Sequence, residues 1–306
     1  MRWLFLKACI CVIAASLLTA FGNSQTAPVS RWVSELVSKH DYPAAEKFLI
    51  DAIRADPRNA PLLRTLGGVF FLDGKYLNCA SALEKARAAN LLDDPSRMTL
   101  ALAYVNLDRP EWARKELKDL VAAHPKRSIY YYWLGRLDFG EQKFQAALEE
   151  FHTAIRFDPQ SARSYDSLGL CNQALGNIEE SLRNFHRAVE LNRKAREPSA
   201  WPSYDLGLLL FETGRTADAK SCFKESLTID PRSAKTHYRL GLADEKLSDY
   251  DAALLELNAA VRLDASYPEP YYALARIYRR QHQEQLAKDA AQTFEKLNKH
   301  RSGEVR

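Results

Sequence analysis

The 306-residue chain is 46% hydrophobic and 27% charged, which is typical of a folded, water-soluble protein and argues against a disordered one. Its formal net charge is +4, and removal of the two cations Arg2 and Lys7 would lower it to about +2. A charge this close to neutral gives no reason to expect a nucleic-acid partner or a strongly acidic one.

The first segment of the chain has the pattern of an export signal. Arg2 and Lys7 form a basic start, and residues 8–21 are mostly apolar. This run is shorter than the roughly 20 residues that a helix needs to cross a bilayer core, but it suits the centre of a signal peptide. Small residues before the site favour cleavage after Gly22. We therefore expect residues 1–22 to be a signal peptide and the mature protein to be periplasmic or secreted, with an uncleaved N-terminal membrane anchor as the alternative.

A spacing of 34 residues then recurs through the chain. The blocks begin near Thr26, Ala60, Asp94, Ser128, Ala162, Ala200, Ala234 and Pro268. Counted from these starts, the seventh position is leucine in all blocks but the first. The eighth position is small in the later blocks, and the twentieth is small in every block. The eighth position holds Val33, Gly67, Ala101, Gly135, Gly169, Gly207, Gly241 and Ala275. A fixed period of this length signals stacked repeats. We expect one array over residues 26–301, followed by a tail at 302–306.

Each block contains two apolar periodicities of helical type, which predict a helix hairpin. In the fourth block a break at 140–142 separates the two helices, and Asp158-Pro159 ends the second one. A single hairpin cannot bury its apolar stripe alone, so neighbouring hairpins must stack. We expect the small eighth position to face the small twentieth position, and large residues at the twenty-fourth position to fill the remaining gaps.

The fifth block is four residues longer than the period, with the excess near 193–199. Four residues are close to one helical turn, so the second helix of this block is expected to extend through about Ala195. This is the one place where the pattern favours a bend between two segments of the array. A longer turn without functional meaning is the alternative.

The positional pattern resembles the tetratricopeptide repeat. The resemblance is carried by leucine-glycine at positions seven and eight, alanine at twenty and twenty-seven, and proline at thirty-two. Position seventeen is often aromatic, as in Tyr42, Tyr76, Phe144 and Tyr250. The resemblance implies an all-α fold, a right-handed superhelical solenoid of about eight helix-turn-helix repeats.

In the resembled family, the first helix of each repeat lines a concave groove that binds peptides. The groove positions of this chain are rich in tyrosine, tryptophan and arginine, the residue types that carry most interface energy. The expected partner-binding residues are Arg64, Tyr132, Arg136, Phe139, Trp201, Tyr204, Phe211, Tyr238, Tyr272, Arg276 and Arg279. Packing of the aromatic side chains and a solvated arginine cap are the alternative roles.

The family's lysine and asparagine clamp for a C-terminal carboxylate is not expected in this chain. The corresponding positions hold Arg64, Gly68, Met98 and Leu102, and no matching asparagine is present. An adaptor for chaperone tails of that kind is therefore not predicted.

The sequence also lacks the motifs that would predict an enzyme. It contains no phosphate-binding loop, His-Glu-x-x-His, Gly-x-Ser-x-Gly or paired-cysteine motif. We expect no cofactor, no metal site and no small-molecule substrate. Cys79, Cys171 and Cys222 fall where small or apolar residues are usual, and are predicted to be free thiols in the core. His152 and His186 are predicted to face solvent.

The predicted function is a non-catalytic scaffold or adaptor of the cell envelope that binds a peptide or protein in its concave groove. A fixed structural subunit of an envelope assembly or secretion complex is the alternative. The expected partner is a protein or peptide and not nucleic acid. The membrane would be contacted only through an uncleaved leader.

Overall fold

The computed structural model describes residues 27–56 and 60–302, where all regular structure is helical. The predicted signal peptide lies outside the described residues. Among the residues described, no helix combines the length and the apolar character that crossing a membrane requires.

The chain divides into two compact units between Lys143 and Phe144. The helices of unit one are α2 (Ala27–Ser38), α3 (Tyr42–Ala55), α4 (Ala60–Leu72), α5 (Tyr76–Ala88), α6 (Asp94–Asn106), α7 (Pro110–Ala123) and α8 (Ser128–Gly140). The helices of unit two are α9 (Phe144–Phe157), α10 (Ala162–Ala174), α11 (Ile178–Arg193), α12 (Trp201–Glu212), α13 (Thr216–Ile229), α14 (Ala234–Lys246), α15 (Tyr250–Leu263), α16 (Pro268–Arg280) and α17 (Glu284–Ser302). The even-numbered helices begin at the block starts or one residue later.

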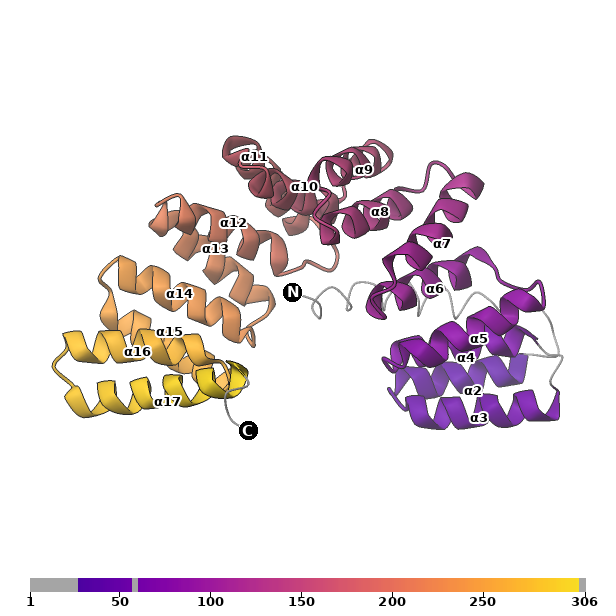
Figure 1. The fold of residues 1–306 in the computed structure, drawn as a ribbon, viewed down its shortest axis with the longest axis horizontal. Coiled ribbons are helices and arrows are strands. Elements are labelled where there is room, and N and C mark those ends of the chain that lie inside the picture. Colours follow the sequence, from indigo (N-terminus) through magenta and orange to yellow (C-terminus); the bar gives the residue numbers. More distant parts are fainter. Residues whose placement is uncertain (1–26, 57–59, 303–306) are drawn as a thin grey trace. The chain divides into compact units, whose positions relative to one another are not determined.

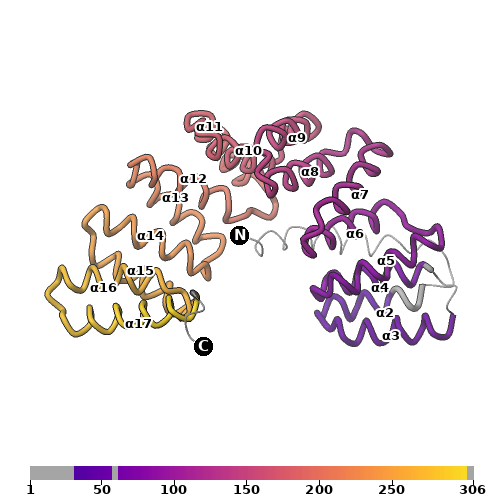
Figure 2. Tube along the Cα trace, viewed as in Figure 1, coloured from indigo at the N-terminus to yellow at the C-terminus, as the bar shows by residue number. Residues whose placement is uncertain are grey.

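Within each unit, helices that follow one another in the chain pack together (Figure 1). The first helices of adjacent hairpins also touch, as α4 and α6 do in unit one and α12, α14 and α16 do in unit two. The backbone trace turns back between α14 and α15 and again between α16 and α17 (Figure 2). The predicted all-α architecture of stacked helix hairpins is therefore confirmed, while its right-handed superhelical course stays a prediction.

The twentieth position of every block is buried, with exposed fractions of 0% to 3%. Its residues are Ala45, Cys79, Ala113, Ala147, Ser181, Ala219, Ala253 and Ala287. The eighth position was expected to pack against the twentieth. In the structure it packs against the twenty-fourth position as well. Ser181 Oγ donates a hydrogen bond to the carbonyl oxygen of Gly169 at 2.7 Å. The space above Gly169, however, is filled from the twenty-fourth position, because a Cβ there would lie 2.6 Å from Cδ1 of Phe185.

The turn inside each hairpin uses a left-handed backbone conformation at the fifteenth position. Its φ angles lie between 57° and 84° at His40, Gly74, Asp108, Gln142, Gly176, Gly214, Ser248 and His282. This conformation ends the first helix and reverses the chain. The next block then starts with a capped helix in several places. Asp93 and Ser161, for example, accept hydrogen bonds from the backbone N–H groups of Ser96 and Ser164.

The longer fifth block lies inside unit two, so the division of the chain into two compact units does not fall there, and the bend stays a prediction. Helix α11 ends at Arg193, two residues before the expected end at Ala195. The side-chain amide of Asn192 then exchanges two hydrogen bonds of 2.8 Å with the backbone of Ser199. Arg193 also donates two hydrogen bonds of 2.7 Å to the carboxylate of Glu225 on α13. These contacts close the extra residues into a fixed turn.

Candidate functional site

A surface pocket of about 570 Å³ lies in unit two and is lined by α12, α14, α15 and α16. Its lining residues are Phe211, Tyr238, Leu242, Glu245, Lys246, Ser248, Tyr250, Tyr272, Ala273, Arg276 and Arg280. The stacking of α12, α14 and α16 explains this composition, because equivalent positions of successive first helices lie next to one another. The pocket combines four aromatic rings with three cations and a single carboxylate.

Two of the cations lie over aromatic rings. The Nζ atom of Lys246 is 4.7 Å from the centre of the Phe211 ring, and 3.5 Å from the Phe211 carbonyl oxygen. The guanidinium carbon of Arg280 is 5.9 Å from the centre of the Tyr250 ring, and Arg280 Nη1 donates a 3.0 Å hydrogen bond to the Tyr250 hydroxyl. A ring face attracts a cation but does not neutralise it. Lys246 and Arg280 therefore keep their charge available at the rim of the pocket.

The third cation, Arg276, is held by the pocket's carboxylate. Its Nε donates a 2.6 Å hydrogen bond to Glu245 Oε1, and its Nη2 pairs with Glu245 Oε2. The Glu245 side chain is only 10% exposed. This two-point pair raises the pKa of Arg276, because Glu245 accepts its hydrogen bonds and stabilises the charged form. Arg276 also lies 5.7 Å from the centre of the Tyr272 ring.

The two predicted tyrosines of the pocket differ in exposure. Tyr272 is 55% exposed and packs against Phe294 of α17, with ring centres 5.3 Å apart. Tyr238 is half-buried and packs edge-to-face with Tyr267 at 5.3 Å. Burial raises the pKa of the Tyr238 hydroxyl, so it stays a neutral hydrogen-bonding group at physiological pH. Tyr272 thus presents a ring to solvent, and Tyr238 forms part of the pocket floor.

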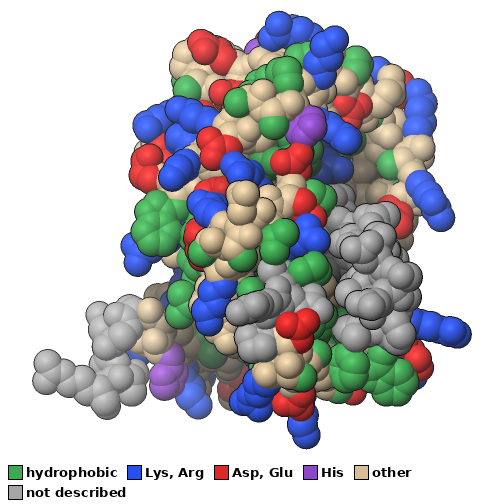
Figure 3. Space-filling model, turned by 90° about the vertical axis from the view of Figure 1, so that its right-hand side faces the viewer, with side chains coloured by type: hydrophobic (Ala, Val, Ile, Leu, Met, Phe, Trp, Pro, Cys, Tyr) green, Lys and Arg blue, Asp and Glu red, His purple; other side chains and the backbone are tan. Residues whose placement is uncertain are grey.

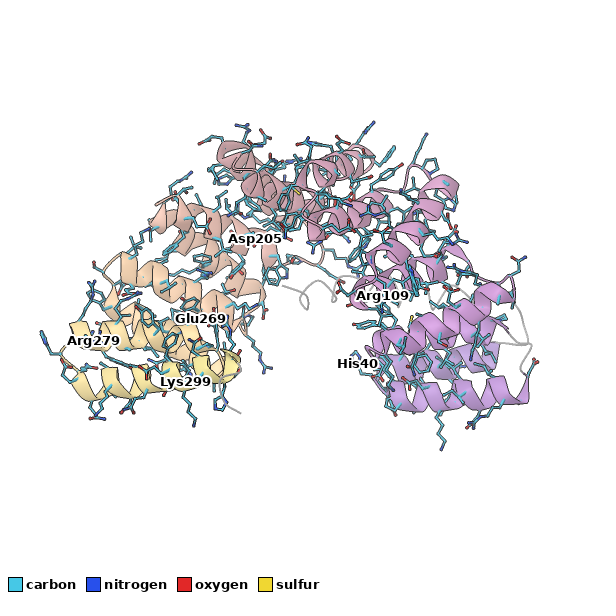
Figure 4. All side chains as sticks on the ribbon, viewed as in Figure 1. His40, Arg109, Asp205, Glu269, Arg279 and Lys299 are labelled. Atoms are coloured by element: carbon cyan, nitrogen blue, oxygen red, sulfur yellow. The ribbon has the colours of Figure 1, made fainter. Side chains whose placement is uncertain are left out.

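Three other predicted residues of unit two lie outside the pocket lining. Trp201 and Tyr204 pack edge-to-face on α12 with ring centres 5.6 Å apart, and Tyr204 also lies 6.0 Å from the buried ring of Phe223. Tyr204 therefore has a packing role as well as a partly exposed surface. Arg279 is exposed and points away from the neighbouring helices at the outer edge of unit two (Figure 4).

The predicted residues of unit one are on α4 and α8, which come earlier in the sequence than the helices that line the pocket. Arg64 forms an ion pair with Asp93 and is only 19% exposed along its side chain. Tyr132 was expected to present its ring to a partner, but it is 4% exposed and packs edge-to-face with Trp133 at 5.5 Å. The large ring is instead used for packing. Arg136 and Phe139 are both partly exposed.

The structure thus brings four of the predicted residues together in one pocket: Phe211, Tyr238, Tyr272 and Arg276. Lys246 and Arg280 join them but were not among the predicted binding residues. Both lie at the thirteenth position of their blocks, on α14 and α16, which are first helices and so belong to the elements expected to line the groove. Tyr250 comes from a second helix, so no rule about first helices could have found it.

The other predicted chemistry-bearing residues show no sign of a second site. Within the described chain, the thiols of Cys79 and Cys171 are buried, and that of Cys222 is half-buried. Burial raises the pKa of the Cys79 thiol to about 12, which makes it unreactive at neutral pH. His152 and His186 are exposed, as expected. Within the described ranges, no three His, Cys, Asp or Glu side chains are grouped so that they could hold a metal ion.

The surface drawn in Figure 3 mixes Lys and Arg side chains with Asp and Glu side chains over its described part. No large field of one sign appears on that face. This mixture agrees with the near-neutral composition.

Comparison with known families agrees with this architecture. One model of the tetratricopeptide repeat matches residues 160–232, and a second matches residues 98–162 and 204–268. Together they cover more than half of the chain without a gap. The chain belongs to the tetratricopeptide repeat (TPR) family. Its helix hairpins are TPR repeats, a scaffold typical of protein interaction rather than of catalysis.

Individual relatives are similar in fold and repeat pattern. A TPR protein from Parabacteroides merdae superposes with a TM-score of 0.63 at 19% identity, covering 88% of this chain and all of that one. YrrB, described as a TPR protein with an unusual peptide-binding site, has a TM-score of 0.51 at 15% identity over 59% of this chain and 91% of its own. The Hsp70-Hsp90 organizing protein of Triticum aestivum is 27% identical over 64% of this chain and 39% of its own length. The chain spans between 17% and 48% of the curated relatives that it matches.

Proposed function

We propose that this TPR protein is a non-catalytic interaction scaffold of the bacterial cell envelope, and that the pocket of unit two receives an extended segment of a partner protein. The observation that carries the proposal is the pocket itself. It places exposed aromatic surface next to uncompensated cations, and these are the anchors that usually dominate binding energy at interfaces. Its volume of about 570 Å³ suits a few side chains rather than a whole domain.

The similarity to YrrB supports a peptide as the ligand, since that protein shares the fold and is described as having a peptide-binding site. The similarity to the Hsp70-Hsp90 organizing protein supports an adaptor role in general. It does not extend to a lysine and asparagine clamp, because Gly68, Met98 and Leu102 cannot supply those groups. The exposed charged face of α17, with Lys288, Asp289 and Lys296, suits contact with solvent.

The envelope location rests on the sequence of the leader. Residues 1–22 combine a basic start, a short apolar run and small residues before Gly22. Fractionation of the native cell followed by N-terminal sequencing tests this part. A mature chain that begins at Asn23 in the periplasm or the medium is expected. A chain that stays in the cytoplasm with Met1 or Arg2 at its start would contradict the proposal.

The binding role is tested by affinity purification from the native envelope with three forms of the protein. The first is the natural chain, and the second carries Tyr272→Ala, which removes an exposed ring of the pocket. The third carries Leu255→Ala, a matched control, because Leu255 is 64% exposed but does not line the pocket. Loss of the same partners in the second form only is expected. Identical partners from all three would argue against the pocket.

A fixed structural subunit of an envelope complex is the second candidate. It is favoured by large apolar side chains that unit one exposes, since Leu77 is 70%, Trp112 is 58% and Trp32 is 51% exposed. Such side chains are common at permanent interfaces. A subunit of this kind would co-purify at constant stoichiometry and would be released by Trp112→Ala but not by Tyr272→Ala.

A further inference from the structure

The cations of the pocket outnumber its carboxylates, and two of them pair with no acidic side chain among the residues that the structure describes. Lys246 contacts the ring and the carbonyl oxygen of Phe211, and Arg280 contacts the ring and the hydroxyl of Tyr250. Over the described residues, neither forms an ion pair with an Asp or Glu side chain, whereas many exposed cations of this chain do. Both side chains are exposed, so keeping the ammonium group of Lys246 and the guanidinium group of Arg280 charged costs little free energy.

The single acid of the pocket is already engaged. Glu245 binds Arg276 at two points and is largely shielded from solvent. A bidentate pair of this kind is directional and uses both oxygens of the carboxylate. Glu245 is therefore not available to neutralise Lys246 or Arg280. It also occupies the Nε and Nη2 donors of Arg276, which would otherwise be the best fork for an incoming carboxylate.

From these contacts we infer a ligand chemistry for the site, which rests on the function proposed above. We propose that the pocket selects partner segments that carry an acidic side chain beside an apolar one. Lys246 and Arg280 hold the carboxylate, and Glu245 keeps Arg276 from binding it. The exposed ring of Tyr272 and the ring of Phe211 receive the neighbouring apolar side chain. A ligand with a basic side chain would meet the free cations and be repelled.

The proposal is tested with pools of synthetic octapeptides of equal apolar content that carry two Glu, two Gln or two Lys residues. Every peptide is acetylated and amidated, so that no chain terminus contributes charge. The full chain is immobilised, and the retained peptides are counted by mass spectrometry. The natural protein is expected to retain the Glu pool about tenfold better than the Gln pool, as one or two charge-assisted hydrogen bonds would provide. The Lys pool is expected to be retained least.

Three variants assign the effect to residues. Lys246→Gln combined with Arg280→Gln should bring the ratio of the Glu pool to the Gln pool close to one. Lys224→Gln combined with Arg232→Gln is the matched control, because both are exposed cations of unit two that do not line the pocket. It should leave the ratio unchanged. Glu245→Gln frees Arg276 and should raise retention of the Glu pool several-fold.

The proposal is overturned if the Glu and Gln pools bind equally well, if neither binds, or if the control variant with Lys224→Gln and Arg232→Gln lowers the ratio as much as the variant of Lys246 and Arg280 does. Preference for the same peptides only when their C-terminus is free would also overturn it, since the carboxylate recognised would then be that of the terminus. These failures are distinct from failure of the interaction function. If Tyr272→Ala abolishes capture of native partners while the pools bind equally, the pocket binds proteins but does not select acidic side chains.

Discussion

Gly207 leaves a space that the ring of Phe223 fills. A Cβ at this position would lie 2.7 Å from Cε1 and 2.9 Å from Cδ1 of that ring. Phe223 is 0% exposed, so the ring has no free volume into which it could withdraw. We expect Gly207→Ala to lower the free energy of unfolding by about 1–3 kcal/mol, the usual cost of overpacking a core. Urea unfolding followed by circular dichroism measures the change.

Gly140 supplies the control for this substitution. It is the last residue of α8, and, apart from its chain neighbours and the backbone of its own helix, no described heavy atom lies within 4 Å of the position that its Cβ would take. Gly140→Ala should be neutral or raise the free energy of unfolding by up to about 1 kcal/mol, because alanine restricts the unfolded chain and favours helix. Equal destabilisation by both substitutions would mean that the eighth position is not a packing position.

The backbone conformation at the fifteenth position shows a limit of what residue type alone can predict. Gly74, Gly176 and Gly214 have left-handed backbone conformations, which the residue type alone favours. Ser248 has the same conformation, with a φ of 63°, although its residue type does not favour it. The repeat imposes the turn on this position whatever its side chain, so register predicts it better than local propensity.

Among the helices, an ion pair between α7 and α8 shows how neighbouring hairpins are tied. Arg114 Nη2 lies 2.9 Å from Asp138 Oδ1 and 3.1 Å from Glu141 Oε1. The Asp138 side chain is only 8% exposed. We expect Arg114→Met to destabilise the protein by about 3 kcal/mol, because it leaves a buried carboxylate without a counter-charge. Lys220 has the equivalent position in unit two and pairs with Asp244 at 2.6 Å.

A double-mutant cycle separates this pairing from the loss of packing by the arginine stem. If the buried charge is the cause, Arg114→Met with Asp138→Asn should be more stable than Arg114→Met alone by about 1 kcal/mol or more. Thermal unfolding of the four proteins measures the coupling. Strict additivity would show that the arginine acts only through its aliphatic chain.

A second link between elements depends on pH. His237 of α14 has its Nδ1 2.6 Å from Glu256 Oε2 of α15, and its Nε2 3.2 Å from the Pro231 carbonyl oxygen. The hydrogen bond to Glu256 raises the pKa of His237 above its usual value of 6.5. The folded state therefore binds this proton more tightly than the unfolded chain does. The resulting stabilisation is fully present below about pH 6.5 and is lost as the pH rises through the folded pKa.

The measurement compares the natural protein with His237→Gln at pH 5.5 and pH 8.5. At pH 5.5 the natural protein should have the larger free energy of unfolding. The difference in this free energy between the two proteins should be smaller at pH 8.5. Glu256→Gln should remove most of the same pH dependence, because it removes the acceptor of the bond. A difference that grows with pH would contradict the assignment of a raised pKa.

Part of the candidate site could be predicted from the way in which successive helices stack. Positions five and nine of successive first helices must lie side by side once the hairpins stack, which is why Tyr238, Tyr272 and Arg276 could be assigned together. The burial of Tyr132 could not be predicted in the same way, because the same position can face a neighbouring ring or solvent. The local excess of cations was hidden by the nearly neutral charge of the whole chain.

On the scale of the whole molecule, stability comes from the packing of neighbouring hairpins on one another rather than from a central core. The twentieth position is buried in every block and the twenty-fourth in the first seven blocks, and consecutive hairpins within each unit pack on one another. The period of the sequence was sufficient to predict this arrangement. It could not predict that the chain would divide at Lys143, because the fourth block has the same pattern as its neighbours on both sides of that residue.

An array held together in this way should be least stable at a helix that has few neighbours. In unit two, α12 packs on α10, α11, α13 and α14, whereas the extensive contacts of α17 among the described helices are with α16. Amide hydrogen exchange, corrected for intrinsic rates, should therefore show protection in α17 at least about tenfold lower than in α12, which corresponds to an opening free energy about 1.4 kcal/mol smaller. Helix α16 should be intermediate, because it contacts α14, α15 and α17. Equal protection of α12 and α17 would mean that unit two opens as a single cooperative body, and local stacking would then not be what limits its stability.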